Sequence, residues 1–372
     1  MFSNRIERLL DQVIQPDAFF CIDNKPLLLF FASPDNKHKK LKQIRNFNES
    51  PIVIVAEADS VEIFNGYEYL LEKGSLKLLG SQEKLDDFHY FHLVTGKSWE
   101  QYRDEFKYDN RIDYHLLENI KATRIALIEK GGLSESLANA ILGKVIFVQY
   151  LIDRRVKLDF EQLGETRVWT NDEFCGLLLN GTKIREFFEY LTNKFGEDLF
   201  PIDKEDFDTM SVECFRVIFD LLIGKEIATG QLSLFGLYDF SIIPVEFISN
   251  VYELFIGQGE QEKKGAYYTP LFLVDYVLSE TVEKRIREPT VDYSCKILDP
   301  ACGSGIFLVE SLRKIIESFR NANPNCEEDP EGYGQALRNL AIENIYGVDR
   351  DESAINVAVF SIYLTLLGLV LF

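Results

Sequence analysis

The sequence predicts an α/β protein whose C-terminal part is the first half of a doubly wound, Rossmann-like sheet. Two short apolar segments predict this fold, because each leads into an aspartate: residues 297–299 (ILD) and 345–349 (IYGVD). A glycine-rich turn follows the first segment, and an apolar helix is expected from residue 306 onward. In doubly wound sheets ligands bind at the carboxyl ends of the parallel strands. A ligand site is therefore predicted at the ends of these two strands.

The turn after the first strand is the heptad DPACGSG, residues 299–305. Its glycines lack a Cβ where the backbone must approach a ligand closely. The following helix directs its partly positive end at a carboxylate or phosphate. No Gly-Lys-Ser/Thr is present, which excludes a P-loop, and a third glycine at the dinucleotide spacing is lacking, which disfavours a nicotinamide or flavin site.

The heptad resembles the cofactor loop of the amino-methylating DNA methyltransferases, so S-adenosylmethionine is the implied cofactor. Upstream, GAYYTP at residues 265–270 resembles the family element that closes over the methionine end of that cofactor. In physical terms, Pro270 suits the first turn of a helix that runs through Val274 and Val277, with Thr269 at its N-cap. Standing alone, this segment would be an ordinary capped helix start.

Asp349 ends the second strand, where doubly wound folds place an acid that accepts hydrogen bonds from ribose hydroxyls. Without the heptad, a turn residue would be the commoner interpretation. The interval from Asp299 to Asp349 is longer than the usual spacing of about twenty residues. The polar segment 321–334 is expected to form a loop that accounts for the excess.

Further segments are similar to adenine-specific DNA methyltransferases of type I and type IIG restriction-modification systems. Residues 243–247 and 251–255 resemble the helical segment that precedes the family's Tyr-Thr-Pro element, and residues 142–155 resemble its preceding long helix. The resemblance implies that Asp299 holds the methionine amino group, Thr269 its carboxylate and Asp349 the ribose. The implied cofactor-binding residues are Tyr268, Thr269, Pro270, Asp299, Pro300, Ala301, Cys302, Gly303, Gly305 and Asp349.

Catalysis in the resembled family needs an Asn/Asp-Pro-Pro-Tyr/Phe tetrapeptide, which binds the exocyclic amine of a flipped base and stacks on it. The sequence has 11 prolines and no two are adjacent, so no catalytic residue is assigned, and no metal ligand either. We expect this chain to be the inactive N-terminal part of a longer enzyme. Two alternatives stay open: a non-catalytic fragment that binds cofactor, DNA or a partner and regulates a complete methyltransferase, and a methyltransferase of RNA or protein.

Residues 353–372 contain no charged side chain. A membrane span is disfavoured, because serine, asparagine and threonine dilute the run and no basic flank follows. The expected structure is a helix packed on a parallel sheet, followed by the start of a buried strand. The helices or strands that would cover this apolar segment are expected to be missing from the chain, so the segment should expose apolar surface and promote association.

Three parts are expected: an α/β module at 1–110, a helical spacer at 111–240 and the first half of the methyltransferase domain at 241–372. In the first part, residues 18–22, 27–32, 52–56 and 61–64 are predicted strands, residues 37–47 are a predicted helix, and 57–59 form a hairpin turn. This order resembles the nuclease-like domain of type I and type IIG enzymes. Asp23 could replace the first acid of its metal site, but no carboxylate or lysine follows in register, so a degenerate domain and a module for protein contacts are equal readings.

The composition bears on the expected binding partners, disulfides and cellular location. The net charge of −20 disfavours binding of DNA by the whole surface, because phosphate contacts dominate such affinity. Double-stranded DNA is the implied partner, mainly through a C-terminal recognition region outside this chain, together with restriction or specificity subunits. A basic cluster at residues 37–45 reads as a solvated helix face or a local DNA contact. The 6 cysteines show no disulfide framework, and the expected location is the cytoplasm, without membrane contact.

Overall fold

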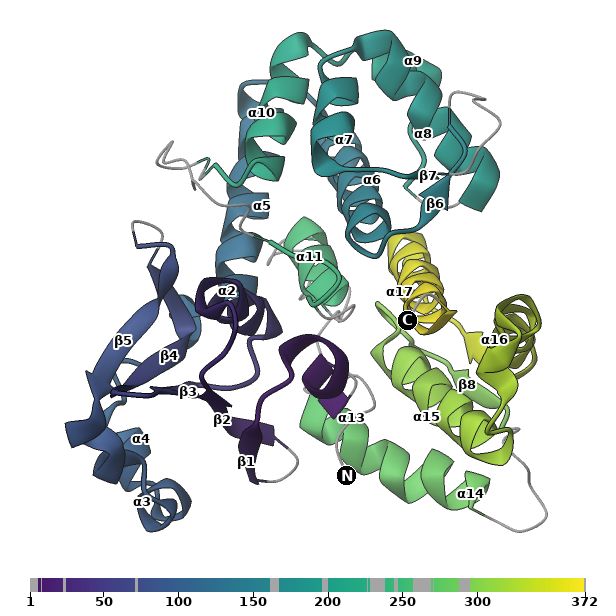
Figure 1. Cartoon of the computed structure of the whole chain (residues 1–372). Coiled ribbons are helices and arrows are strands. Elements are labelled where there is room, and N and C mark those ends of the chain that lie inside the picture. The colour runs from purple at the N-terminus through teal and green to yellow at the C-terminus, as the bar shows by residue number, and fades with distance from the viewer. Residues whose placement is uncertain are drawn as a thin grey trace. The chain divides into compact units, whose positions relative to one another are not determined.

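The computed structural model describes residues 6–7, 9–22, 25–70, 73–160, 167–195, 200–225, 227, 238–243, 247–256, 269, 271–287 and 295–370. The chain divides into two compact units, whose helices and strands are labelled in Figure 1. Unit 1 comprises residues 1–122 and 220–243, and unit 2 comprises residues 123–219 and 244–372. The α/β class is confirmed. The predicted boundaries at 110 and 240 remain predictions.

Unit 1 contains a five-stranded sheet in the order β1-β2-β3-β4-β5. The strands are Ala18–Ile22, Lys25–Ala32, Ile52–Glu57, Ser60–Leu70 and Ser75–Ser81. β2 and β3 are parallel and joined through helix α2 (Lys37–Phe47), whereas the other neighbours are antiparallel. The predicted strands, helix and hairpin turn are confirmed. β5 and the second half of β4 were not predicted, and the register of this pair shifts between Asn65 and Tyr69.

The apolar face of α2 packs against this sheet. Leu41, Ile44 and Phe47 are buried in one cluster with Leu29 and Phe31 of β2. Burying each such side chain contributes about 1.5–3 kcal/mol. Shorter elements complete the unit: Leu9–Ile14, Gln82–Phe88, α3 (Tyr90–Thr95), α4 (Lys97–Gln101) and Tyr108–Asn110.

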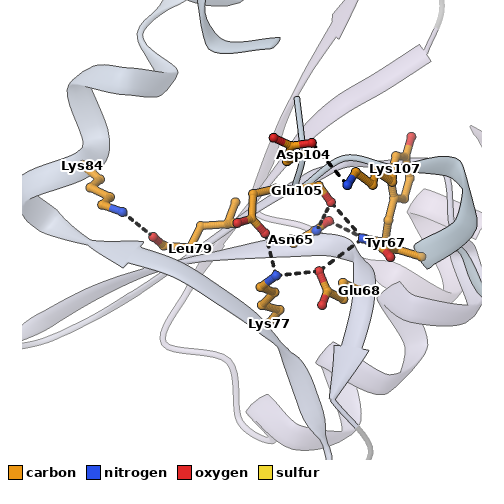
Figure 2. A network of polar contacts seen from close by, with 10 residues as sticks. Asn65, Tyr67, Glu68, Lys77, Leu79, Lys84, Asp104, Glu105 and Lys107 are labelled. Carbon is orange, nitrogen blue, oxygen red and sulfur yellow. Dashed lines mark hydrogen bonds and ion pairs between the residues drawn. The ribbon is translucent and has the colours of Figure 1, made fainter. Parts of the chain in front are cut away.

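A polar network secures the irregular part of β4 (Figure 2). Asn65 is fully buried; its side chain donates to the Glu105 carbonyl at 2.7 Å and accepts from the Tyr67 amide at 3.0 Å. Lys77 of β5 binds Glu68 at 3.0 Å and Glu105 at 2.7 Å. These contacts lie where the register of the β4–β5 pair shifts, between Asn65 and Tyr69.

The basic cluster of α2 is partly committed to the fold. Lys37 pairs with Glu62, Lys40 donates to the Ile14 carbonyl at 2.7 Å, and Arg45 is 6% exposed with its guanidinium 4.3 Å from the centre of the Tyr69 ring. Burial lowers the pKa of Arg45 to about 10. These three positive charges make contacts within unit 1, so the predicted solvated helix face is limited to part of the cluster, and fewer charges remain for a DNA contact.

Unit 2 is mainly helical. Its first helices are α6 (Glu135–Asp153), α7 (Asn171–Leu178), α8 (Gly181–Phe195) and α9 (Lys204–Asp208), with a small hairpin of β6 (Lys157–Leu158) and β7 (Arg167–Val168). α5 (Ile112–Glu129) and α10 (Val212–Leu222) lie across the boundaries between the units. Gly131 and Gly132 lie in the turn between α5 and α6.

The second half of unit 2 carries the predicted strands, β8 (Ile297–Asp299) and β9 (Ile345–Gly347). Its helices are α11 (Phe247–Ile256), α13 (Leu271–Leu278), continued by Ser279–Glu283 and α14 (Lys284–Ile286), then α15 (Ile306–Ala322), α16 (Pro330–Asn344) and α17 (Glu352–Val370). The loop predicted at 321–334 is confirmed for residues 323–329 and wrong at its ends, where α15 continues to Ala322 and α16 begins at Pro330. Asp329 caps α16 by accepting from the Gly332 amide at 3.1 Å, and Pro330 begins that helix, because proline is well suited to a first helical position.

The C-terminal segment corrects two expectations. α17 continues to Val370, so the strand start predicted after a helix is wrong as far as residue 370. Part of its apolar surface is also covered: Phe360 and Leu364 are fully buried, and the Phe360 ring lies 5.2 Å from that of Phe147 in α6, whereas Val359 is 47% exposed. Among the described helices α6 is long and apolar enough to cross a membrane, but 78% of its apolar window is buried inside the protein.

Candidate functional site

The two predicted strands lie side by side and end together. β8 and β9 are parallel, with Ile297 opposite Ile345 and Asp299 opposite Gly347. The Val348 amide donates to the Asp299 carbonyl at 2.9 Å, and the Cys302 amide donates to the Val348 carbonyl at 3.0 Å. The parallel ladder therefore continues into the glycine turn and brings the turns after both strands to one edge.

The two glycines of the heptad have different surroundings. Gly303 has φ +52°, and a Cβ placed on it would have no atom within 4 Å. Gly305 has φ +87°, and a Cβ there would come within 2.8 Å of the Ala358 Cβ of α17. Gly303 thus leaves room for a ligand beside the backbone. Gly305 is required by helix packing, a reason that sequence reasoning missed.

Both strand-end aspartates accept hydrogen bonds from backbone amides. Asp299 Oδ1 accepts from the Ala301 amide at 3.1 Å, within its own turn. Asp349 Oδ2 accepts from the Gly303 amide at 2.9 Å, and its Oδ1 accepts from the Asp351 amide at 2.8 Å. The structure therefore brings together the acids that the sequence predicted, and it joins one of them to the glycine turn of the other strand.

Cys302 lies beneath the turn, whereas Pro300 and Ala301 are exposed. Its side chain is 5% exposed and packs in a cluster with Leu308 and Ala358. Burial, and then the charges of Asp299 and Asp349, raise the pKa of the Cys302 thiol to about 11. A neutral, buried thiol fills space and is a poor nucleophile.

The Tyr-Thr-Pro element is only partly visible. Tyr268 and Pro270 lie outside the described residues, and Thr269 is half-buried. The predicted helix is confirmed as α13, which begins at Leu271. Its buried Val274 packs with Ile306 in the first turn of α15, so α13 lies beside the amino-terminal end of the helix that follows the heptad.

A cavity of about 490 Å³ opens beside β8. Its lining includes Leu298, Asp299, Pro300, Phe307 and Ser311. The Ser311 hydroxyl is buried without a hydrogen-bond partner among the described residues. The sequence does contain a signal for this buried hydroxyl, because Ser311 stands on the apolar face of α15, four residues after Phe307. No cluster of three or more histidine, cysteine or acidic side chains that could hold a metal occurs in the described part of the chain.

Comparison with known proteins gives one family. Residues 245–365 match the N-6 DNA methylase family. The chain is 28% identical to the type I restriction enzyme MjaVIII methylase subunit of Methanocaldococcus jannaschii, over 49% of this chain and 32% of that protein. It is 31% identical to the type I restriction enzyme HindI methylase subunit of Haemophilus influenzae, over 31% of this chain and 25% of the other.

A putative type II restriction enzyme and methyltransferase of M. jannaschii, RM.MjaORFECS2P, is 26% identical over 33% of this chain and 14% of its own length. The chain thus spans at most about a third of the length of these relatives. No solved structure shows significant similarity to it. The resemblance to adenine-specific DNA methyltransferases of restriction-modification systems, predicted from the heptad and the second strand, is confirmed, and residues 245–365 carry the match to the N-6 DNA methylase family.

Proposed function

We propose that this chain is part of an S-adenosylmethionine-dependent DNA methyltransferase of a restriction-modification system, acting on the exocyclic amine of adenine. One observation carries the proposal: two parallel strands end in aspartates at one edge, and a glycine turn with free space beside Gly303 lies between them. Ligands of doubly wound sheets bind at such an edge. The similarity of residues 245–365 to N-6 DNA methylases supports the reaction class.

The residues present fit that cofactor. Asp299 would hold the methionine amino group, and Thr269 the methionine carboxylate, with Tyr268 and Pro270 beside it. The main chain from Pro300 to Gly305 would line the methionine moiety, because Gly303 carries no side chain toward the open space. Asp349 would accept hydrogen bonds from the ribose hydroxyls. When bound, S-adenosylmethionine would supply an activated methyl group, and the protein's contribution would be mainly positioning.

Methyl transfer itself needs more than these residues. The 372 residues contain no Asn/Asp-Pro-Pro-aromatic tetrapeptide, so we propose that the chain alone binds cofactor without transferring methyl. Double-stranded DNA, restriction or specificity subunits and a cytoplasmic location are part of the same proposal. The Rossmann-like continuation of the β8–β9 pair is proposed on the same grounds.

Calorimetric titration with S-adenosylhomocysteine tests the cofactor. Asp299→Asn and Asp349→Ala should each weaken binding about tenfold or more, because each removes a charge-assisted contact worth about 1.5–3 kcal/mol. Asp329→Asn, which alters a capping carboxylate at α16 instead, should bind like the wild type. Absence of binding by the wild-type chain at millimolar ligand would refute the proposal, as would equal binding by all three variants. Transfer of labelled methyl groups to duplex DNA by the chain alone would refute the predicted inactivity.

A further inference from the structure

The side chain of Asp349 spans the two turns at the ends of β8 and β9. Its Oδ2 accepts from the Gly303 amide at 2.9 Å, and its Oδ1 accepts from the Asp351 amide at 2.8 Å. The first bond reaches back into the heptad, whereas the second stays within the turn that follows β9. The Asp349 carboxylate therefore adds a side-chain link between the two turns, beside the backbone hydrogen bond from the Cys302 amide to the Val348 carbonyl.

The Gly303 peptide depends on this bond more than its neighbours depend on theirs. Cys302 is held by burial and by the hydrogen bond that its backbone amide donates to the Val348 carbonyl. Gly305 is held by the hydrogen bond that its amide donates to the Cys302 carbonyl and by its close packing against Ala358. Gly303 has left-handed backbone geometry, and nothing lies within 4 Å of its Cβ position. Packing does not restrain that side of the residue, so the hydrogen bond from its amide to Asp349 sets its orientation.

Asp299 does not provide an equivalent link. Its carboxylate accepts from the Ala301 amide, which is two residues away in the same turn. A local bond of this kind shapes a turn without tying it to another strand. The two acids at this edge therefore differ in role, although both follow the same pattern in the sequence.

Asp349 also retains capacity for a ligand. An ionised carboxylate offers about four lone-pair positions on its two oxygens. The hydrogen bonds from the Gly303 and Asp351 amides use one position on each oxygen. A pair of neighbouring hydroxyls could bind the remaining positions without displacing either amide. The same side chain would then contact the ligand and support the turn that receives another part of it.

We propose that Asp349 is a positioning residue for the glycine turn, which it holds before any ligand binds, in addition to contacting the ribose. This inference rests on the proposed cofactor site. It predicts that loss of the carboxylate disorders the turn in the ligand-free protein and weakens recognition of the amino-acid moiety, beyond the loss of ribose contacts.

The first test is amide hydrogen exchange of the ligand-free chain, followed by mass spectrometry of peptides that cover residues 299–309. Asp349→Ala should raise exchange at Gly303 at least tenfold, while Asp349→Asn, which keeps one acceptor oxygen, should restore part of the protection. Asp329→Ala removes a carboxylate–amide bond of the same kind at α16 and should leave residues 299–309 unchanged. Protected amides of α15 serve as an internal control for folding of each variant.

The second test compares two ligands in the wild type and Asp349→Ala. S-adenosylhomocysteine carries the amino-acid moiety, and methylthioadenosine carries the ribose and adenine without it. If Asp349 positions the turn, the variant loses more affinity for the first ligand than for the second, so their affinity ratio falls. An unchanged ratio would mean that Asp349 contacts the ribose alone.

The outcomes separate this inference from the proposed function. Unchanged exchange at Gly303 in Asp349→Ala refutes the positioning role, even if cofactor binding falls. If Asp349→Ala raises exchange at Gly303 but the wild type binds neither ligand, the structural link between Asp349 and the turn is retained and the proposed cofactor site is refuted.

Discussion

Replacing Lys144 by methionine should stabilise unit 2, although it removes a hydrogen bond. Lys144 lies in α6 and is 5% exposed. Its Nζ donates to the Thr192 hydroxyl at 3.1 Å and lies 5.9 Å from the centre of the Phe188 ring. Burial lowers the pKa of Lys144 from 10.5 to about 8. The folded protein therefore carries a positive charge in a poorly hydrated environment.

The size of the effect follows from that pKa difference. One pKa unit corresponds to about 1.4 kcal/mol, so the charged amine destabilises the fold by about 3 kcal/mol at neutral pH. Methionine has a similar length and no charge, but it leaves the Thr192 hydroxyl without this donor, at about 1 kcal/mol. Lys144→Met should therefore raise the free energy of unfolding by about 2 kcal/mol at pH 7.

The sign of the pH dependence follows from linkage. Below about pH 8 the lysine is protonated in both the folded and unfolded states, so the full penalty applies. Between about pH 8 and pH 10.5 the unfolded state binds more protons, so the stability of the wild type rises with pH across this window. The advantage of the methionine variant should fall below about 1 kcal/mol by pH 10.

Urea unfolding followed by tryptophan fluorescence measures this difference. The chain has 2 tryptophans, and Trp169 is buried in unit 2 beside Phe187, with ring centres 5.3 Å apart. In a Trp99→Phe background the signal therefore reports unit 2 alone. Lys284→Met, at a side chain that is 62% exposed, is the control and should change stability by less than about 0.5 kcal/mol. Equal advantages of Lys144→Met at pH 7 and pH 10, or destabilisation at both, would refute the reasoning.

Three further predictions concern unit 1 and the glycine turn. Asn65→Ala should lower the stability of unit 1 by about 2 kcal/mol, because the Tyr67 amide loses its buried acceptor; urea unfolding followed through Trp99 measures it, and a loss below about 0.5 kcal/mol would contradict the role of the network. Gly305→Ala should lower the melting temperature more than Gly303→Ala, because both have positive φ but only the first meets Ala358; equal melting temperatures would contradict this. Iodoacetamide labelling of Cys302, mapped by mass spectrometry, should be slow at pH 7.5 and rise toward pH 11, because burial raises the pKa of its thiol; rapid labelling of the folded protein at neutral pH would show a reactive thiolate instead.

The sequence predicted those parts of the fold in which local patterns and packing agree. Helix α2 was predicted with the bounds observed, and its local features agree with its packing: Asn36 caps it by accepting from the Lys39 amide, and Leu41, Ile44 and Phe47 are buried at helical spacing. The α17 segment shows where local patterns fail. Its uncharged run suggested uncovered surface, but the covering residues come from α6, about two hundred positions earlier, where Phe147 meets Phe360 and Arg154 donates to the Leu364 carbonyl at 2.8 Å.

The candidate site was predictable in its residues and less so in its contacts. Strand-end acids and a glycine turn can be read from the order of residue types. The reason for Gly305 could not, because Ala358 lies in another helix. The burial of Lys144 could not be predicted either, since a lysine within an apolar helix could as well have been at the protein surface.

The long interval between Asp299 and Asp349 illustrates what determines such a site. A polar loop was expected to absorb the excess, yet α15 and α16 both lie within the crossover. The extra helix does not move the acids apart, because the register of a parallel pair is fixed by its ladder rather than by the length of the connection. With Asp299 opposite Gly347, Asp349 falls two residues beyond the last pair. At that place its carboxylate returns to the Gly303 amide, so an acid one position earlier or later would be expected to miss the turn. Moving the carboxylate in Asp349→Ala combined with Val348→Asp should therefore fail to restore slow exchange at Gly303, whereas restoration would show that any nearby charge suffices.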